Sequence, residues 1–68
     1  MIVKVAPIGE RVVEVNVESG STVAQILSIA AVEENGRTIS VNNVPSTMDT
    51  NVTSEGAVIL LAGKMKGG

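Results

Sequence analysis

Two valine-rich segments open the chain, and both alternate apolar with polar side chains. Residues 1–6 and 11–17 show the two-residue period that is typical of a half-buried β-strand. The four residues between them, 7–10, have the sequence Pro-Ile-Gly-Glu, which suits a tight turn. We therefore predict an N-terminal antiparallel hairpin.

The apolar pattern changes to a helical period after a polar break at residues 18–21. Thr22 and Gln25 match a capping box, in which a hydroxyl and a side-chain amide satisfy free main-chain amides at a helix start. Apolar residues then recur at the spacing i, i+3, i+4 and i+7, which is the stripe of a helix lying on a sheet. The stripe consists of Val23, Ile26, Leu27 and Ala30. We predict a helix that begins at Val23.

The predicted helix fades after Val32, where the sequence becomes acidic and polar. Acidic side chains are unfavourable in the last turn of a helix, and Gly36 can adopt a left-handed conformation at the exit. Ile29 lies beside the apolar stripe, so we expect it to be partly exposed.

A third, short strand is predicted at residues 38–41, with Ile39 and Val41 facing inward. The next two residues, Asn42 and Asn43, tolerate positive φ angles and should turn the chain back.

The segment after this turn is predicted to be irregular or to lie at a sheet edge. Pro45 cannot donate a main-chain hydrogen bond, which confines residues 44–48 to such a position. Residues 49–53 are predicted to form a short helical turn that Val52 anchors in the core.

The final predicted strand is the apolar run at residues 57–62, which Gly56 and Gly63 bound. A short continuous apolar run is typical of a strand in the middle of a sheet. We expect Val58 and Leu60 to face the helix. Strand alternation then places Ile59 and Leu61 on the uncovered face. There they would form an apolar patch with Ile2 and Val12. The predicted core consists of Val3, Val5, Val13, Val15, Val17, Val23, Leu27, Ala30, Val41, Val58 and Leu60.

The order of these elements predicts an α+β fold of the β-grasp type. A mixed four- to five-stranded sheet would carry one helix on one face, with the last strand next to the first. We expect residues 1–68 to form a single domain, in which residues 63–68 are a flexible tail.

Composition and charge narrow the possible functions. The net charge is -2, and the chain contains no histidine, cysteine or aromatic residue. The five basic residues are scattered and no aromatic side chain can stack on a base, which argues against binding to nucleic acid. A catalytic histidine or thiol and the commonest metal ligands are absent, so we expect neither an active site nor a metal site within the chain. No apolar run is long enough to span a membrane, and we expect a cytoplasmic protein.

The sequence ends in two glycines, Gly67 and Gly68, after the lysine-containing segment 63–66. A glycine-rich end is also common in frayed termini without a function. The functional interpretation is that the carboxylate of Gly68 is a substrate, because two residues without a Cβ can enter a narrow groove.

Several segments in this order resemble the sulfur-carrier branch of the ubiquitin-like superfamily. They are the valine-rich hairpin, Thr-Val-Ala at 22–24, Val-Asn-Asn at 41–43, Ser-Glu-Gly-Ala at 54–57 and the glycines at 67–68. The family is typified by the small subunit of molybdopterin synthase and by the thiamine-pathway sulfur carrier.

This resemblance implies a carrier and not an enzyme. A ubiquitin-activating-like enzyme would bind ATP and adenylate Gly68, and the chain itself would need no cofactor. The product would be a thiocarboxylate for a molybdopterin synthase large subunit or another sulfur acceptor. Conjugation of Gly68 to target lysines is one alternative, and a non-covalent β-grasp binding module is another. The reactive residues would be Gly67 and Gly68, and the partner-binding residues Ile59, Leu61, Lys64, Met65 and Lys66.

Overall fold

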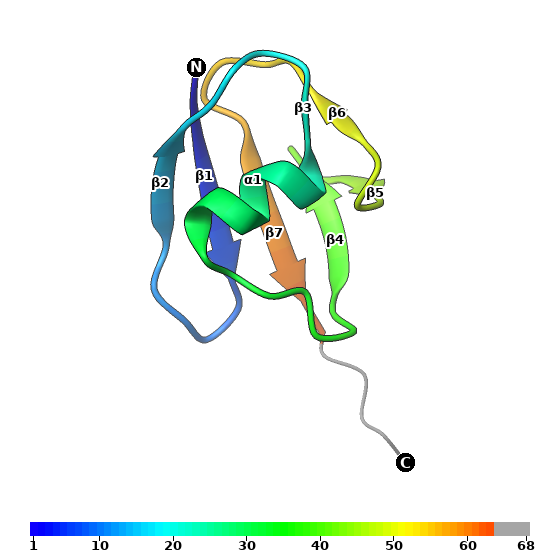
Figure 1. Cartoon of the computed structure of the whole chain (residues 1–68). Helices are drawn as coiled ribbons and strands as arrows, with labels where there is room; N and C mark the ends of the chain where they lie inside the picture. The colour runs from blue at the N-terminus through cyan, green and yellow to red at the C-terminus, as the bar shows by residue number, and fades with distance from the viewer. Residues whose placement is uncertain (64–68) are drawn as a thin grey trace.

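A five-stranded mixed sheet with one helix across one face forms the framework of the protein (Figure 1). This is a computed structural model that describes residues 1–63. The strand order in the sheet is β2-β1-β7-β4-β5. The elements of the framework are β1 (Ile2–Pro7), β2 (Val13–Asn16), α1 (Val23–Ala30), β4 (Thr38–Val41), β5 (Val44–Ser46) and β7 (Val58–Ala62). The predicted α+β, β-grasp-like architecture is confirmed.

The last strand lies at the centre of the sheet, as its continuous apolar sequence predicts. β7 pairs in parallel with β1 and antiparallel with β4, so both of its edges are occupied. The N-terminal hairpin is also confirmed, because β1 and β2 pair antiparallel. β5 lies at the sheet edge and contains Pro45, where a missing main-chain donor costs no ladder hydrogen bond.

The helix begins where the capping box predicts. The Gln25 amide donates to Thr22 Oγ1 over 3.2 Å, and the Thr22 amide donates to Gln25 Oε1 over 2.9 Å. Val23, Ile26 and Leu27 are buried, while Ile29 is 59% exposed. The predicted stripe and the exposure of Ile29 are therefore both correct.

The end of the helix differs from the prediction. The helix stops at Ala30, and Ala31 adopts a left-handed conformation with φ 60°. The Ala31 amide still donates to the Leu27 and Ser28 carbonyl oxygens, so the last turn closes tightly. Gly36 does have a positive φ, of 74°, but it belongs to a later turn.

The predicted helical turn at residues 49–53 is wrong. Asn51–Val52 forms strand β6, which pairs antiparallel with β3 (Ser21–Thr22) just before the helix. This small ladder satisfies main-chain groups that a helical turn would have satisfied internally. The expected role of Val52 is correct, since its side chain is 1% exposed and packs in the core.

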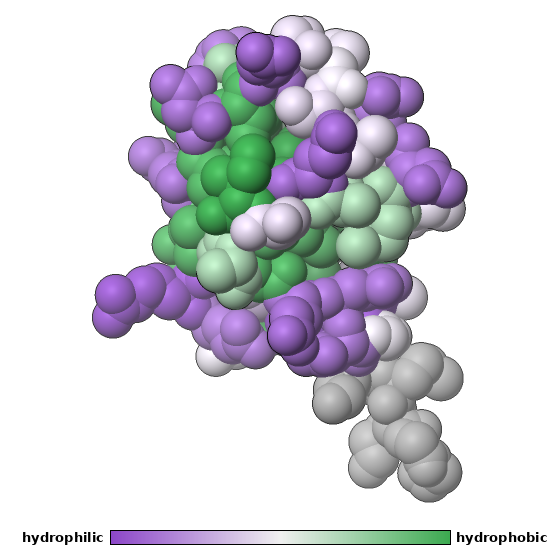
Figure 2. Space-filling model, viewed as in Figure 1, coloured by the Kyte–Doolittle hydropathy of each residue, from purple (hydrophilic) through white to green (hydrophobic). Residues whose placement is uncertain are grey.

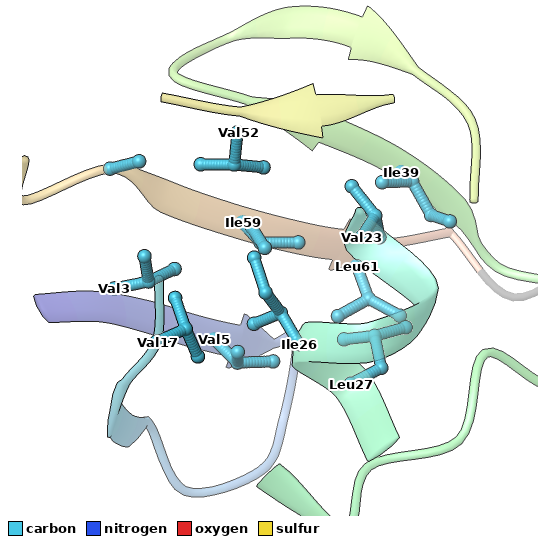
Figure 3. Close-up of a cluster of buried hydrophobic side chains, with 11 residues drawn as sticks. Val3, Val5, Val17, Val23, Ile26, Leu27, Ile39, Val52, Ile59 and Leu61 are labelled. Carbon is cyan, nitrogen blue, oxygen red and sulfur yellow. The ribbon is translucent and has the colours of Figure 1, made fainter. Parts of the chain in front are cut away.

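The core lies between α1 and the face of the sheet that the helix covers (Figure 3). Its buried residues are Val3, Val5, Val17, Val23, Ile26, Leu27, Ile39, Val52, Ala57, Ile59 and Leu61. Val15, Ala30 and Val41 are partly buried and pack against this cluster. Val58 and Leu60 are not part of the core, which corrects the predicted orientation of the last strand.

Candidate functional site

The two faces of β7 are reversed relative to the sequence prediction. Ile59 and Leu61 are both 0% exposed and lie under α1, so they cannot form an exposed partner-binding patch. The register explains the reversal, because Ile59 pairs with Val5, and directly paired residues share a face of the sheet. Val5 is itself 0% exposed, so the same face carries Ile59.

The opposite side of the sheet, which we call the open face, carries Val58 and Leu60. Val58 is 38% exposed, and Ile2 on the adjacent strand β1 is 39% exposed. The exposure predicted for Ile2 and Val12 is therefore correct, although their neighbours on β7 are different. We define the open-face patch as Ile2, Ala6, Val58, Leu60 and Ala62.

Small neighbours make Leu60 prominent within this patch. Leu60 pairs with Ala6 on β1 and with Ser40 on β4, and neither side chain is long enough to cover it. A charged pair lies within the patch, because Lys4 is between Ile2 and Ala6 on the same face, opposite Val58, and its Nζ lies 4.0 Å from Glu14 Oε2. Exposed apolar side chains next to polar ones are a common composition of protein-binding surfaces.

The turn between β4 and β5 forms a polar border of the patch. Asn42 and Asn43 have φ angles of 50° and 70°, as a two-residue hairpin turn requires. Asn42 pairs with Val58 through both of its amide groups: its main-chain N–H donates to the Val58 carbonyl, and its Oδ1 accepts from the Val58 N–H. Four residues line a hollow on the open face: Asn42, Asn43, Val58 and Leu60.

The opposite, helix-bearing face also exposes apolar side chains. Figure 2 shows hydrophobic residues gathered over this face between more polar surroundings. Ile29 on α1 is 59% exposed, and Val13 and Val15 of β2 are half-buried beside the helix. This surface and the open-face patch lie on opposite faces of the molecule.

The end of β7 is held on both sides. The Ile8 amide donates to the Leu61 carbonyl oxygen over 2.8 Å, and Thr38 Oγ1 donates to the Ala62 carbonyl oxygen over 2.7 Å. Gly63 follows with φ 66° and is the last described residue. The predicted reactive and partner-binding residues Lys64, Met65, Lys66, Gly67 and Gly68 lie outside the described part of the chain.

An ion pair lies beside this strand end, and sequence reasoning missed it. Arg37 Nη2 donates to Glu10 Oε2 over 3.0 Å, although 27 positions separate the two residues. The Arg37 side chain is only 10% exposed, whereas that of Glu10 is 56% exposed. Together with Ile8, Asn35 and Gly63 they line a hollow, which we call the tail-root hollow.

Within residues 1–63, no three acidic side chains are grouped so that they could hold a metal ion. Across the same residues, no helix is long and apolar enough to cross a membrane. The site therefore consists of the open-face patch, the end of β7 and the tail-root hollow.

No protein-family model, curated protein or solved structure matches this chain. The geometry above and the chemistry of the sequence are therefore the basis for assigning a function.

Proposed function

We propose that this protein is a ubiquitin-like sulfur carrier of the cytoplasm, whose Gly68 carboxylate is activated by an adenylating enzyme. The observation that carries the proposal is the position of β7. This strand lies at the centre of the sheet, displays the open-face patch and leads directly into the segment that ends in Gly67 and Gly68. A partner bound to the patch would thus hold the chain next to its reactive end. The sequence resemblance to sulfur carriers supports the same function.

The proposed chemistry has two steps. An oxygen of the Gly68 carboxylate attacks the α-phosphorus of ATP, and pyrophosphate leaves. Hydrosulfide, or a sulfur donor such as a persulfide with a reductant, then attacks the carbonyl carbon of the acyl-adenylate, and AMP leaves. With hydrosulfide the products are a thiocarboxylate and AMP, and no oxidation or reduction occurs.

In this proposal the chain is a substrate, and the partner supplies the catalysis. The sequence contains no histidine or cysteine that could act as a base or nucleophile. ATP would be bound by the partner, because the chain has no glycine-rich phosphate loop. A molybdopterin synthase large subunit or another acceptor would receive the sulfur.

The open-face patch is the docking surface in this proposal. It replaces the predicted pair Ile59 and Leu61 with Val58 and Leu60, which lie in the same strand but face the other way. Several apolar side chains grouped on the face away from the helix are stronger evidence for a binding surface than a single exposed aliphatic residue.

Intact-mass spectrometry tests the proposal. The intact mass of the purified protein is measured first, to establish that the chain ends at Gly68. It would then be incubated with ATP, sulfide and an adenylating enzyme from the same cells. Replacement of one oxygen by one sulfur at the C-terminus is the expected result.

A variant that lacks Gly68 is the matched control and should not react, while remaining folded. A conjugate joined through Gly68 to a lysine would identify a protein modifier instead. A stable complex without any change in mass would identify a non-covalent binding module. Pyrophosphate exchange that persists without Gly68 would contradict the proposed role of this residue.

A further inference from the structure

The two edges of the five-stranded sheet differ in how well they are protected. At one edge, Pro45 takes the middle position of β5 and has no N–H to offer, so a further strand could not pair fully there. At the other edge, β2 contains no proline, and no segment of residues 1–63 pairs with its outer side. An unprotected strand edge is a template for another extended chain.

The register shows which main-chain groups of β2 point outward. The Val17 N–H donates to the Met1 carbonyl oxygen over 2.8 Å, and the Met1 ammonium group donates to the Val17 carbonyl oxygen over 2.7 Å. Antiparallel strands alternate between such bonded pairs and pairs without hydrogen bonds, so the valines of β2 also bond to β1. The N–H and C=O groups of Glu14 and Asn16 therefore face away from β1, and no hydrogen bond within residues 1–63 uses them.

The two faces beside this edge have different chemistry. Val13 and Val15 are half-buried on the helix-bearing face, where Figure 2 shows an apolar surface. Glu14 lies on the open face, and its ion pair with Lys4 is long, at 4.0 Å. Glu18 follows the strand and has no ion pair within residues 1–63. A strand added at this edge would place alternate side chains beside the valines and beside the carboxylates.

A hollow continues the edge beyond the end of β2. Residues 16–21 line it on one side, and exposed side chains of α1 line it on the other. Glu18 is one of the lining residues. A lysine or arginine side chain could therefore lie with its apolar stem along the helix and its charge near this carboxylate.

We propose that the outer edge of β2 binds an extended segment of a partner protein, in which apolar side chains alternate with lysine or arginine. The segment pairs antiparallel with the free main-chain groups of Glu14 and Asn16. Its apolar side chains extend the surface of Val13 and Val15, and its basic side chains neutralise the carboxylates on the other face. A second copy of this chain would instead add a further Glu14 and Glu18 to the same edge, so charge favours a basic partner.

The inference does not depend on the activation of Gly68. The outer edge of β2 shares no residue with the open-face patch, which the proposed function assigns to the activating enzyme. The edge is therefore left for a second partner.

Two isomeric peptides test the main-chain pairing. Both have blocked ends and alternate lysine with valine, but one is N-methylated on its lysines and the other on its valines. In antiparallel pairing the ligand residue opposite Glu14 lies on the same face and is a lysine, so the lysine amides point toward β2. We expect the lysine-methylated peptide to bind at least about tenfold more weakly than the valine-methylated one. Equal affinities would overturn the proposal.

Amide NMR titration of the full-length protein measures these affinities. The largest shifts are expected at Glu14 and Asn16. A peptide of the same composition, with its lysines and valines in two separate blocks, is the control for charge alone. Equal affinity for the block peptide and the unmethylated alternating peptide would overturn the proposal.

Three variants test the protein side with the unmethylated alternating peptide. Asn16→Pro removes an outward N–H and leaves the ladder to β1 intact, so the fold should be retained. We expect it to weaken binding by about tenfold. Glu14→Gln should weaken binding by about threefold, whereas Glu33→Gln, at an exposed residue after α1, should have no effect. Equal losses for the two glutamine variants would reduce the interaction to net charge and overturn the proposal.

The isomeric peptides decide the question without any variant, even where Asn16→Pro does not fold. Analytical ultracentrifugation of the wild-type protein without peptide tests the other possible occupant. We expect a monomer at the concentrations of the titration. A dimer that Asn16→Pro abolishes would show that a second copy pairs with this edge, and would overturn the proposal.

Discussion

Ile59 and Val58 are adjacent residues of similar chemistry that occupy opposite environments. Ile59 is 0% exposed beneath α1, and Val58 is 38% exposed on the open face. Both follow from the pairing of β7 with β1, where Val5 is opposite Ile59 and Lys4 is opposite Val58. A lysine can remain hydrated only on the face away from the core.

Substitution of these two neighbours should have very different effects on stability. Ile59→Ala leaves a cavity in the core and should lower the free energy of unfolding by about 2–5 kcal/mol. Val58→Thr keeps a β-branched side chain at a partly exposed position and should change it by about 1 kcal/mol or less. Urea denaturation midpoints measure both effects. Equal losses would mean that the register described for β7 is wrong.

Ala31 has a backbone conformation that its residue type does not favour. Its φ angle of 60° places the Cβ close to the following carbonyl oxygen, a conformation that costs an L-residue about 1–2 kcal/mol. Helices commonly use glycine at such a position.

We therefore expect Ala31→Gly to stabilise the protein. The relief of strain exceeds the extra unfolded-state entropy of glycine, so the net gain should be about 0.5–1 kcal/mol. The same substitution one residue earlier, Ala30→Gly, falls inside the helix and should instead cost about 0.5–1 kcal/mol. Thermal unfolding of the two variants provides the comparison, and a loss of stability in both would contradict the left-handed cap.

At the scale of elements, the helix α1 is the main cover over the sheet. Its buried residues Val23, Ile26 and Leu27 come from one stripe, and the opposite side of the helix is exposed. Leu27 is 2% exposed and packs among the buried side chains of the core. A domain of this size has little stability to lose.

Leu27→Ala should lower the free energy of unfolding by about 2–5 kcal/mol, because the cavity cannot be filled by neighbours from a second helix. The exposed neighbour Ser28 provides the control, since Ser28→Ala should change it by about 0.5 kcal/mol or less. Denaturation monitored by far-UV circular dichroism measures both. A small effect of Leu27→Ala would mean that the helix packs through another face.

Features that neighbouring residues determine could be predicted from the sequence. Features that depend on pairing with distant segments, or that have no residue preference to mark them, could not. The helix start was predictable because Thr22 and Gln25 form their own cap. The helix end was not, since Ala31 carries no sign of its left-handed conformation. The orientation of β7 was also hidden, because every residue of this strand is apolar and only its partners decide which face is buried.

At the scale of the whole molecule, the candidate site depends on strand order. β1 and β4 flank β7, and this arrangement brings Glu10 and Arg37 together beside the end of β7. In the sequence, Arg37 is one of five scattered basic residues, and Glu10 is part of a predicted turn. A separation of 27 positions with no shared pattern gives no signal of such a pair. The open-face patch was predicted as a feature of the sheet, but two of its residues were assigned to the wrong side.

The last prediction concerns which face of the molecule the activating partner binds. Val58→Glu places a charge in the open-face patch, at a position where Lys4 on the adjacent strand can pair with it, so the fold should be retained. Burial of the new carboxylate under a partner would be costly. We therefore expect binding to weaken by at least about tenfold, equivalent to about 1.4 kcal/mol.

Ile29→Glu is the matched control, because it introduces the same charge at an exposed aliphatic residue on the opposite, helix-bearing face. Its affinity for the partner should equal that of the wild type. Isothermal titration with the adenylating enzyme measures both affinities, after NMR has verified that both variants fold. Weakened binding for Ile29→Glu alone would transfer the docking surface to the helix-bearing face.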